Sequence, residues 1–178
     1  MVDKWPLLEE KEGYASVPFN VLEKTYRIPK KNTEFTAHVL KIPNWANIIA
    51  QNEDGHILLI RQFRFGTDKI EVEIPGGCLE AEEDPMHGAK RELLEETGYI
   101  AKIWHQIGVV DANPAIQTNK CYTFYCSELE ATGKTDFDEN EDIEYFFVSK
   151  DEVDTFIKEG VITNTYIIAA FYWFEKFR

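Results

Sequence analysis

Apolar and polar residues alternate along several short stretches in the first half of the chain, which is typical of β-strands. Residues 19–28, 34–41 and 45–51 carry this pattern, and residues 56–65 form a further apolar run. The segment IPKKN predicts a turn between the first two strands, and NEDG predicts a hairpin into the fourth. In the first strands the alternation is too irregular to fix which face of the sheet each residue occupies.

The second half of the chain interleaves strands with helices. Residues 99–110, 120–129 and 143–149 predict strands. Residues 149–160 and 164–177 predict helices, and the first of these has Ser149 as its N-cap and Gly160 at its end. Strands that precede, separate and follow helices indicate an α+β fold or a mixed α/β sandwich.

A further helix is predicted within the stretch GGCLEAEEDPMHGAKRELLEETGY, residues 76–99. Asp84 suits its N-cap, Pro85 its first position and Gly98 its C-terminal stop. At ~3.6 residues per turn, four residues fall on one side of this helix and form its core-facing stripe. They are Met86, Ala89, Leu93 and Thr97.

The same helix concentrates acidic residues, which have two interpretations. One is a solvated acidic face, which is common on helices. Against it, Glu92 and Glu96 stand at a spacing where like charges repel, toward the helix C-terminus, where the helix dipole disfavours anions. The preceding residues 74–77 predict a glycine turn able to aim a backbone carbonyl at these carboxylates. Such oxygens suit a hard cation, so we expect a site for Mg²⁺ or Mn²⁺.

Two neighbours of these carboxylates add to the prediction. Arg91 and Glu95 are four residues apart on the helix, so they can form an ion pair that fixes one carboxylate. Gly88 lies one turn before Glu92, and we expect it to leave open space beside the carboxylates.

Composition and charge narrow the class of protein. The 178 residues suit one domain with a good core, and 44% apolar residues argue against disorder. The apolar runs are too short to span a bilayer and no basic-then-apolar leader opens the sequence, so we expect a cytoplasmic protein without a membrane partner. The net charge of -13 disfavours nucleic acid, and an anionic ligand would need local cations or bound metal. Three cysteines without zinc-like spacing predict core or bystander thiols.

Fixed spacings in the acidic stretch resemble a known motif. Gly77, Glu83 and the run RELLEETGY at 91–99 resemble the Nudix box, the helix-bearing motif of the Nudix hydrolases, although Tyr99 stands where the family usually carries an aliphatic residue. The order of strands is similar from Phe19 onward. The resemblance implies an α/β/α sandwich, the Nudix fold, and hydrolysis of a nucleoside diphosphate linked to another group with the help of a divalent metal.

The resemblance also implies roles for residues of the motif. Arg91 would orient Glu95, and Glu83 would support the site or help to bind a metal. The implied metal ligands within the motif are the backbone carbonyl of Gly76 and the carboxylates of Glu92, Glu95 and Glu96.

The motif leaves the catalytic base open. A second acidic cluster, DFDENEDIE at 136–144, is by itself typical of a solvated loop. The ADP-ribose pyrophosphatase branch of the family supplies its base from a loop at this place, and ENED at 139–142 resembles that loop. On this resemblance Glu139 would be the base and Glu141 an additional metal contact, with the reverse assignment still open. The catalytic set implied in this way is Arg91, Glu95, Glu139 and Glu141.

Features outside the motif resemble the same branch. Pro114, which lies 15 residues beyond Tyr99, resembles its marker proline, although Ala115 follows where that branch often has Gly. The run RQFRFG followed by EVEIPGG is also similar. By this resemblance Arg64 would contact the diphosphate and Glu73 a metal-bound water or the substrate. The alternative for Arg64 is an ordinary surface arginine at a strand end.

The N-terminal strands add an expectation about assembly. Phe19 and Phe35 align near positions that clamp the adenine in that branch, and plain packing is the alternative for both. The branch is typically homodimeric, with N-terminal strands that contribute to the partner's site, so the resemblance implies a homodimer. Residues 1–44 would form an N-terminal β-hairpin or small antiparallel sheet for dimerisation and base binding, and residues 45–178 the Nudix domain.

Together these features predict metal-dependent hydrolysis of ADP-ribose, or of a related nucleoside diphosphate sugar, to a nucleoside monophosphate and a sugar phosphate. Two alternatives stay open. One is a Nudix hydrolase of dinucleoside polyphosphates or nucleoside triphosphates. The other is a non-catalytic, nucleotide-sensing Nudix module, although such modules usually lack carboxylates that are present here.

Overall fold

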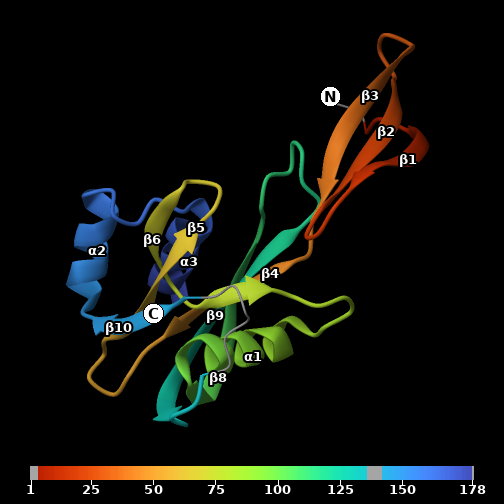
Figure 1. Ribbon diagram of the computed structural model, residues 1–178. Helices are drawn as coiled ribbons and strands as arrows, with labels where there is room; N and C mark the ends of the chain where they lie inside the picture. The colour runs from red at the N-terminus through yellow and green to blue at the C-terminus, as the bar shows by residue number, and fades with distance from the viewer. Residues whose placement is uncertain (1–3, 136–141, 178) are drawn as a thin grey trace. The chain divides into compact units, whose positions relative to one another are not determined.

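A computed structural model describes residues 4–135 and 142–177, which form an α+β fold of ten strands and three helices (Figure 1). The strands are β1 (Leu7–Ala15), β2 (Asn20–Ile28), β3 (Thr33–Lys41), β4 (Trp45–Ala50), β5 (Ile57–Arg64), β6 (Lys69–Glu73), β7 (Gly76–Cys78), β8 (Tyr99–Asp111), β9 (Lys120–Ala131) and β10 (Glu144–Val148). The helices are α1 (Pro85–Thr97), α2 (Lys150–Lys158) and α3 (Thr165–Phe177). None of the helices in these two ranges is long and apolar enough to cross a membrane.

The chain divides into two compact units. The first contains residues 1–43 and 111–120, and the second contains residues 44–110 and 121–178. The segment 111–120 joins the first unit because Leu40 of β3 donates its backbone N–H to Ile116 and accepts one from Thr118. The roles predicted for residues 1–44 and 45–178 as separate domains stay predictions.

The first unit is built on a three-stranded antiparallel sheet in the order β1-β2-β3, which confirms the small N-terminal sheet. Sequence patterning predicted β2 and β3 but missed β1. All nine residues of β1 are exposed, so this strand has no buried face to impose an alternation of apolar and polar residues. Within this sheet only Leu22 is buried.

The second unit contains two further sheets, ordered β7-β4-β9-β8 and β10-β5-β6. In the first of them β4 runs parallel to β9 and antiparallel to β7. The predicted turn at 52–55 forms, because the backbone N–H of Gly55 and the side chain of Asn52 close it. The strands on either side of it then enter different sheets and share only the bridge between Gln51 and Ile57, so the predicted hairpin is confined to the turn.

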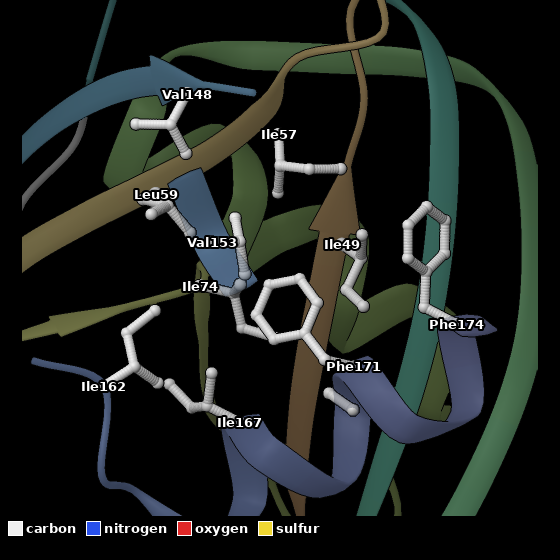
Figure 2. Packing of buried hydrophobic residues seen from close by; sticks show 11 residues of the cluster. Ile49, Ile57, Leu59, Ile74, Val148, Val153, Ile162, Ile167, Phe171 and Phe174 are labelled. Carbon is white, nitrogen blue, oxygen red and sulfur yellow. The ribbon is translucent and has the colours of Figure 1, made fainter. Parts of the chain in front are cut away.

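Strand β4 lies at the centre of this unit because both of its faces are covered. Successive side chains of a strand point to opposite faces. Ile48 belongs to an apolar cluster with Ala89 and Leu93 of α1, whereas Ile49 belongs to a second cluster with Phe171 of α3. Figure 2 shows the second cluster, in which side chains from β4, β5, β10, α2 and α3 meet. The layers are helix, sheets and helices, as the predicted α/β/α sandwich requires.

Helix α1 begins and ends where the sequence predicts. The Asp84 side chain accepts hydrogen bonds from the backbone N–H groups of Met86 and His87, both at 3.1 Å. Gly98 ends the helix with a φ of 70°, a left-handed conformation that glycine adopts without strain. Of the predicted stripe, Met86 is partly buried and the other three residues are buried. Helix α1 is thereby fixed against β4.

Candidate active site

The acidic face of α1 is buried rather than solvated. Glu92 and Glu96 are only 8% and 3% exposed. The backbone N–H of Gly76 donates a 2.9 Å hydrogen bond to the Glu96 carboxylate. A Cβ at position 77 would collide with the carboxylate of Glu92. The two glycines therefore let the backbone approach both carboxylates, and a solvated acidic face is ruled out as the interpretation of these two residues.

Residues 76–78 form strand β7 and not the predicted glycine turn. Asn47 and Trp45 of β4 pair with Gly76 and Cys78, respectively. A Cβ at position 76 would collide with the backbone carbonyl of Ala46 across this pair. Sequence reasoning missed the strand because its few residues show no period, and because consecutive glycines commonly mark turns. The predicted role of the Gly76 carbonyl as a metal ligand stays a prediction.

Arg91 connects four groups around this site. Its guanidinium donates to Glu95 at 2.8 Å, which confirms the i,i+4 ion pair, and to Glu92 at 2.9 Å. It also donates two hydrogen bonds of 3.1 Å to Glu83 and one of 3.2 Å to the carbonyl of Cys78. Hydrogen bonding to Arg91 lowers the pKa of Glu83, and the same contact raises the pKa of Arg91. The guanidinium therefore stays charged, and the Glu83 carboxylate beside it stays ionised near neutral pH.

The open space expected beside Gly88 is filled. A Cβ at this position would collide with the side chain of Leu79 and come within 2.9 Å of a Glu83 carboxylate oxygen. Gly88 is thus required for close packing of the loop before α1 rather than for access to the carboxylates. This contact places Glu83 where Arg91 can reach it.

A pocket of about 330 Å³ lies over the carboxylates. It is lined by Trp45, Gln62, Arg64, Gly76, Gly77, Cys78, Glu80, Arg91, Glu92, Glu95 and Glu96. The structure thus brings together the residues predicted from the motif with Arg64, which lies outside it. A pocket of this size and polarity is suited to a small charged ligand.

The donor atoms of this pocket are of the chemical type that binds a hard divalent cation. Carboxylate oxygens and a backbone carbonyl are the ligands that Mg²⁺ and Mn²⁺ prefer, and buried carboxylates at a repulsive spacing are stabilised by nearby positive charge. Among residues 4–135 and 142–177, no three Asp, Glu, His or Cys side chains are arranged as a ready metal site. The ligand assignments of Glu92, Glu95 and Glu96 therefore stay predictions.

Arg64 reaches the pocket from the end of β5, and a buried carboxylate fixes its position. Its Nε donates to the Glu73 carboxylate at 3.0 Å, and Glu73 is only 2% exposed. The guanidinium also lies 5.6 Å from the ring centre of Trp45. Asn164 donates to the other Glu73 oxygen at 2.9 Å. Arg64 is therefore held by these contacts beside the carboxylates of α1, where it could meet an anion.

Three other predicted site residues belong to the first unit. Phe19 lies directly before β2 and Phe35 lies in β3 of the first unit, and they are 36% and 52% exposed. Pro114 lies in an exposed turn of the same unit. Glu139 and Glu141 lie outside the described residues. The functions predicted for these five residues stay predictions.

Sequence reasoning missed Gln62 and Glu80, which line the pocket, and three further residues that the structure brings to the site. Trp45 and Cys78 line the pocket because β4 pairs with β7, and Asn164 reaches Glu73 from the start of α3. Cys121 and Cys126 are buried as predicted, whereas Cys78 is half-buried in the pocket. Burial, and after it the charge of Glu92, raise the pKa of the Cys78 thiol, so the thiol stays protonated near neutral pH. Only for Asn164 was there a signal in the sequence, because Asn before an apolar helix suits an N-cap.

The chain is similar to known proteins over most of its length. The model of the NUDIX domain family matches residues 42–171. An ADP-ribose pyrophosphatase of Bacillus subtilis is 34% identical over 115 residues, which are 64% of this chain and 62% of that protein. An ADP-ribose pyrophosphatase of Saccharomyces cerevisiae is 35% identical over 108 residues, which are 56% of this chain and 47% of that protein. The aligned part of this chain thus spans less than two thirds of either relative.

A solved structure described as an ADP compounds hydrolase superposes with a TM-score of 0.85. The match covers 99% of this chain and 95% of that one, at 17% sequence identity. At this identity the likeness establishes the fold.

The Arg91 contact predicts an acid-dependent contribution of Glu83 to stability. A carboxylate whose pKa is lowered by folding stabilises the protein above its unfolded pKa of about 4.3, and this contribution is lost as the pH falls through the folded pKa. In metal-free protein, Glu83→Gln should therefore lower the urea unfolding midpoint most near pH 6–7, and the gap to wild type should close in acid. Glu82→Gln, in the exposed turn beside it, is the matched control and should follow the wild-type profile. A gap for Glu83→Gln that is constant with pH would contradict the assignment.

Proposed function

This chain belongs to the Nudix family, and we propose that it hydrolyses the pyrophosphate bond of ADP-ribose or of a related nucleoside diphosphate sugar. The products would be a nucleoside monophosphate and a sugar phosphate. The observation that carries the proposal is the pocket that Glu92, Glu95 and Glu96 line together with Arg64 and Arg91. The names of the relatives from Bacillus subtilis and Saccharomyces cerevisiae support the choice of substrate.

The reaction requires positive charge and a base. Water forms a new bond to one phosphorus, the bridging P–O bond breaks, and its electron pair leaves with the departing phosphate. Bound Mg²⁺ or Mn²⁺ would neutralise the phosphate oxygens and acidify the attacking water. Glu92 and Glu96 would hold the cation, with Glu95 and the carbonyl of Gly76 as further ligands. The fit rests on the all-oxygen donor set and on the glycine cradle around the Glu92 carboxylate.

The two arginines would hold the negatively charged groups of the site and of the substrate in place. Arg91 fixes Glu95 and Glu83 by hydrogen bonds and so orients the acidic face before substrate arrives. Arg64 would donate to the diphosphate, and Glu73 would fix the guanidinium and contact the substrate or a metal-bound water. Because Glu73 and Arg64 are already paired, little conformational entropy would be lost when a diphosphate binds.

We assign the proton transfer to the acidic segment 136–144, which follows β9 in the sequence. Glu139 would accept the proton of the attacking water, and Glu141 would be an additional metal ligand. The resemblance of residues 139–142 to the base-bearing loop of ADP-ribose pyrophosphatases supports this order of roles.

We extend the proposal to a homodimer whose N-terminal sheets contribute to substrate binding. Phe19 and Phe35 would then clamp the base, and Pro114 would lie at the binding region. The first unit exposes large apolar side chains, including Val17 at 94%, Tyr14 at 67% and Phe35 at 52%, which supports an interface on this unit.

A panel of substrates tests the proposed activity. With Mg²⁺ present, ADP-ribose and nucleoside diphosphate sugars should be cleaved to a monophosphate and a sugar phosphate, as followed by chromatography of the products. Dinucleoside polyphosphates and nucleoside triphosphates should be poorer substrates. Turnover of a triphosphate with all sugar nucleotides inert would overturn the proposal, and failure to cleave any of them would favour a binding module.

The metal assignment predicts the effect of neutralising the α1 carboxylates. Glu92→Gln and Glu96→Gln should each lower kcat by roughly 10³-fold, because charge stabilisation by a bound cation is worth several kcal/mol in such reactions. Both variants should keep the wild-type circular dichroism spectrum, and binding of Mn²⁺ measured by electron paramagnetic resonance should weaken. Glu82→Gln, an exposed neighbour, serves as the control. Wild-type rates in both variants would refute the assignment.

The base assignment predicts unequal effects of substitutions within the acidic segment 136–144. Glu139→Gln should lower kcat by roughly 10²-fold or more, as expected when a general base is lost, and Glu141→Gln should have a smaller effect. Mn²⁺ affinity distinguishes the roles, because Glu141→Gln should weaken it and Glu139→Gln should not. The opposite ranking of rates would exchange the two roles.

A further inference from the structure

A second cavity lies next to the acidic pocket and shares Arg64 with it. Its volume is about 440 Å³, in the range of small-molecule sites. The β5–β6 hairpin and the start of α3 form its walls. The polar residues that line it are Arg64, Thr67, Glu71, Thr163, Asn164 and Thr165, with Glu73 at the junction.

The lining of this second cavity is rich in hydroxyl groups and carries acidic side chains. Thr163 and Thr165 are exposed, and within the described residues neither hydroxyl makes a hydrogen bond. Glu71 adds a half-buried carboxylate. The residues found to line the cavity in the described part of the chain include no aromatic side chain. Hydroxyls and carboxylates arranged in this way can exchange hydrogen bonds with a polyhydroxylated ligand.

The wall that carries the two threonines is held rigidly. Asn164, between them, donates to Glu73 at 2.9 Å and accepts from the backbone N–H of Tyr166 at 3.0 Å. Its carbonyl also accepts from the backbone N–H of Ile168. The start of α3 is therefore tied to the same carboxylate that fixes Arg64, so the threonines keep a constant position relative to the arginine.

We propose that the second cavity binds the sugar half of the substrate, with Thr163 and Thr165 as hydrogen-bonding partners of the sugar hydroxyls. The assignment rests on the proposed function, in which Arg64 contacts the diphosphate. Because Arg64 lines both cavities, a diphosphate held by it would lie within reach of both the α1 carboxylates and the second cavity.

The chemistry of the cavity favours a sugar over the other groups that such a substrate can carry. A nucleobase is usually held by stacking on aromatic side chains, which this lining does not supply within the described residues. Additional phosphates would meet the carboxylate of Glu71, and Arg64, the one cationic side chain among the described residues that line the cavity, would already be engaged by the diphosphate. A neutral polyol avoids this repulsion and uses the available hydroxyls. The cavity therefore selects against dinucleoside polyphosphates and triphosphates.

Separate probes for the two halves of the substrate test the assignment. Ribose 5-phosphate and AMP are titrated into the full-length protein with Mg²⁺ by isothermal calorimetry. The Thr163→Val/Thr165→Val variant removes two hydroxyls at nearly constant side-chain volume. Its Kd for ribose 5-phosphate should rise by about tenfold, the loss expected for two neutral hydrogen bonds, with the Kd for AMP unchanged. The KM for ADP-ribose should rise in parallel.

Controls separate this effect from general damage. Thr155→Val, on the exposed face of α2 and outside both cavities, is the matched control and should change neither Kd nor turnover. Circular dichroism checks that each variant is folded. The two single threonine variants are also measured, so the assignment can still be tested if the double variant folds poorly.

The outcomes distinguish this inference from the proposed function. If ADP-ribose is cleaved but the threonine variants weaken AMP instead of ribose 5-phosphate, or weaken neither, the sugar assignment is wrong while the activity stands. A wild-type protein that does not bind ribose 5-phosphate also overturns it. If ADP-ribose is not cleaved but ribose 5-phosphate binds through the threonines, the cavity assignment stands and the proposed function fails.

Discussion

The burial of the Glu92 and Glu96 carboxylates against the backbone of β7 is the constraint on which the rest of the site depends. Moving an ionised carboxylate out of water is unfavourable unless opposite charge and hydrogen bonds replace the lost hydration. Arg91 supplies part of that charge, because one guanidinium contacts Glu83, Glu92 and Glu95 together. The Gly76 N–H supplies a hydrogen bond to Glu96. One guanidinium beside several acidic side chains leaves the site with a formal negative charge, which the proposed cation would offset.

Strand β4 connects this acidic site to the second cavity. Trp45 lines the acidic pocket, and its indole N–H donates to the side chain of Asn47 at 2.8 Å. Asn47 in turn donates to the carbonyl of Tyr166, at the start of α3, at 3.1 Å. Together with the contact of Asn164 to Glu73, this gives α3 two polar connections to the groups around Arg64. Because the same strand is packed on both faces, the two cavities are held by one rigid core.

The distribution of charge explains how a protein with a net charge of -13 could bind an anion. The long-range field repels a diphosphate, so capture has to rely on short-range contacts with fixed cations. Arg64 and Arg91 line the same pocket, and each is held by at least one carboxylate. Arginine suits this position because its planar guanidinium can bind a carboxylate on one edge and a phosphate on another.

Local sequence was enough to predict the helices whose ends carry capping residues. Asp84, Pro85 and Gly98 fixed the bounds of α1, and Ser149 fixed the start of α2, because capping depends on residues only a few positions apart. The acidic spacing within α1 predicted which carboxylates would lie together for the same reason. Strand β1 was missed because its residues are all exposed, and β7 because three residues carry no period.

The amino-acid sequence by itself determined the α+β class, the helix that bears the acidic residues and the family motif, since these follow from composition, caps and spacing along one element. Tertiary structure alone decided that Glu92 and Glu96 are buried, and that Leu79 and Glu83 occupy the space beside Gly88. It also decided that Asn164 donates a hydrogen bond to Glu73, 91 residues away in the sequence. Such contacts depend on how sheets and helices pack across long sequence separations, and no local pattern of side chains encodes that arrangement.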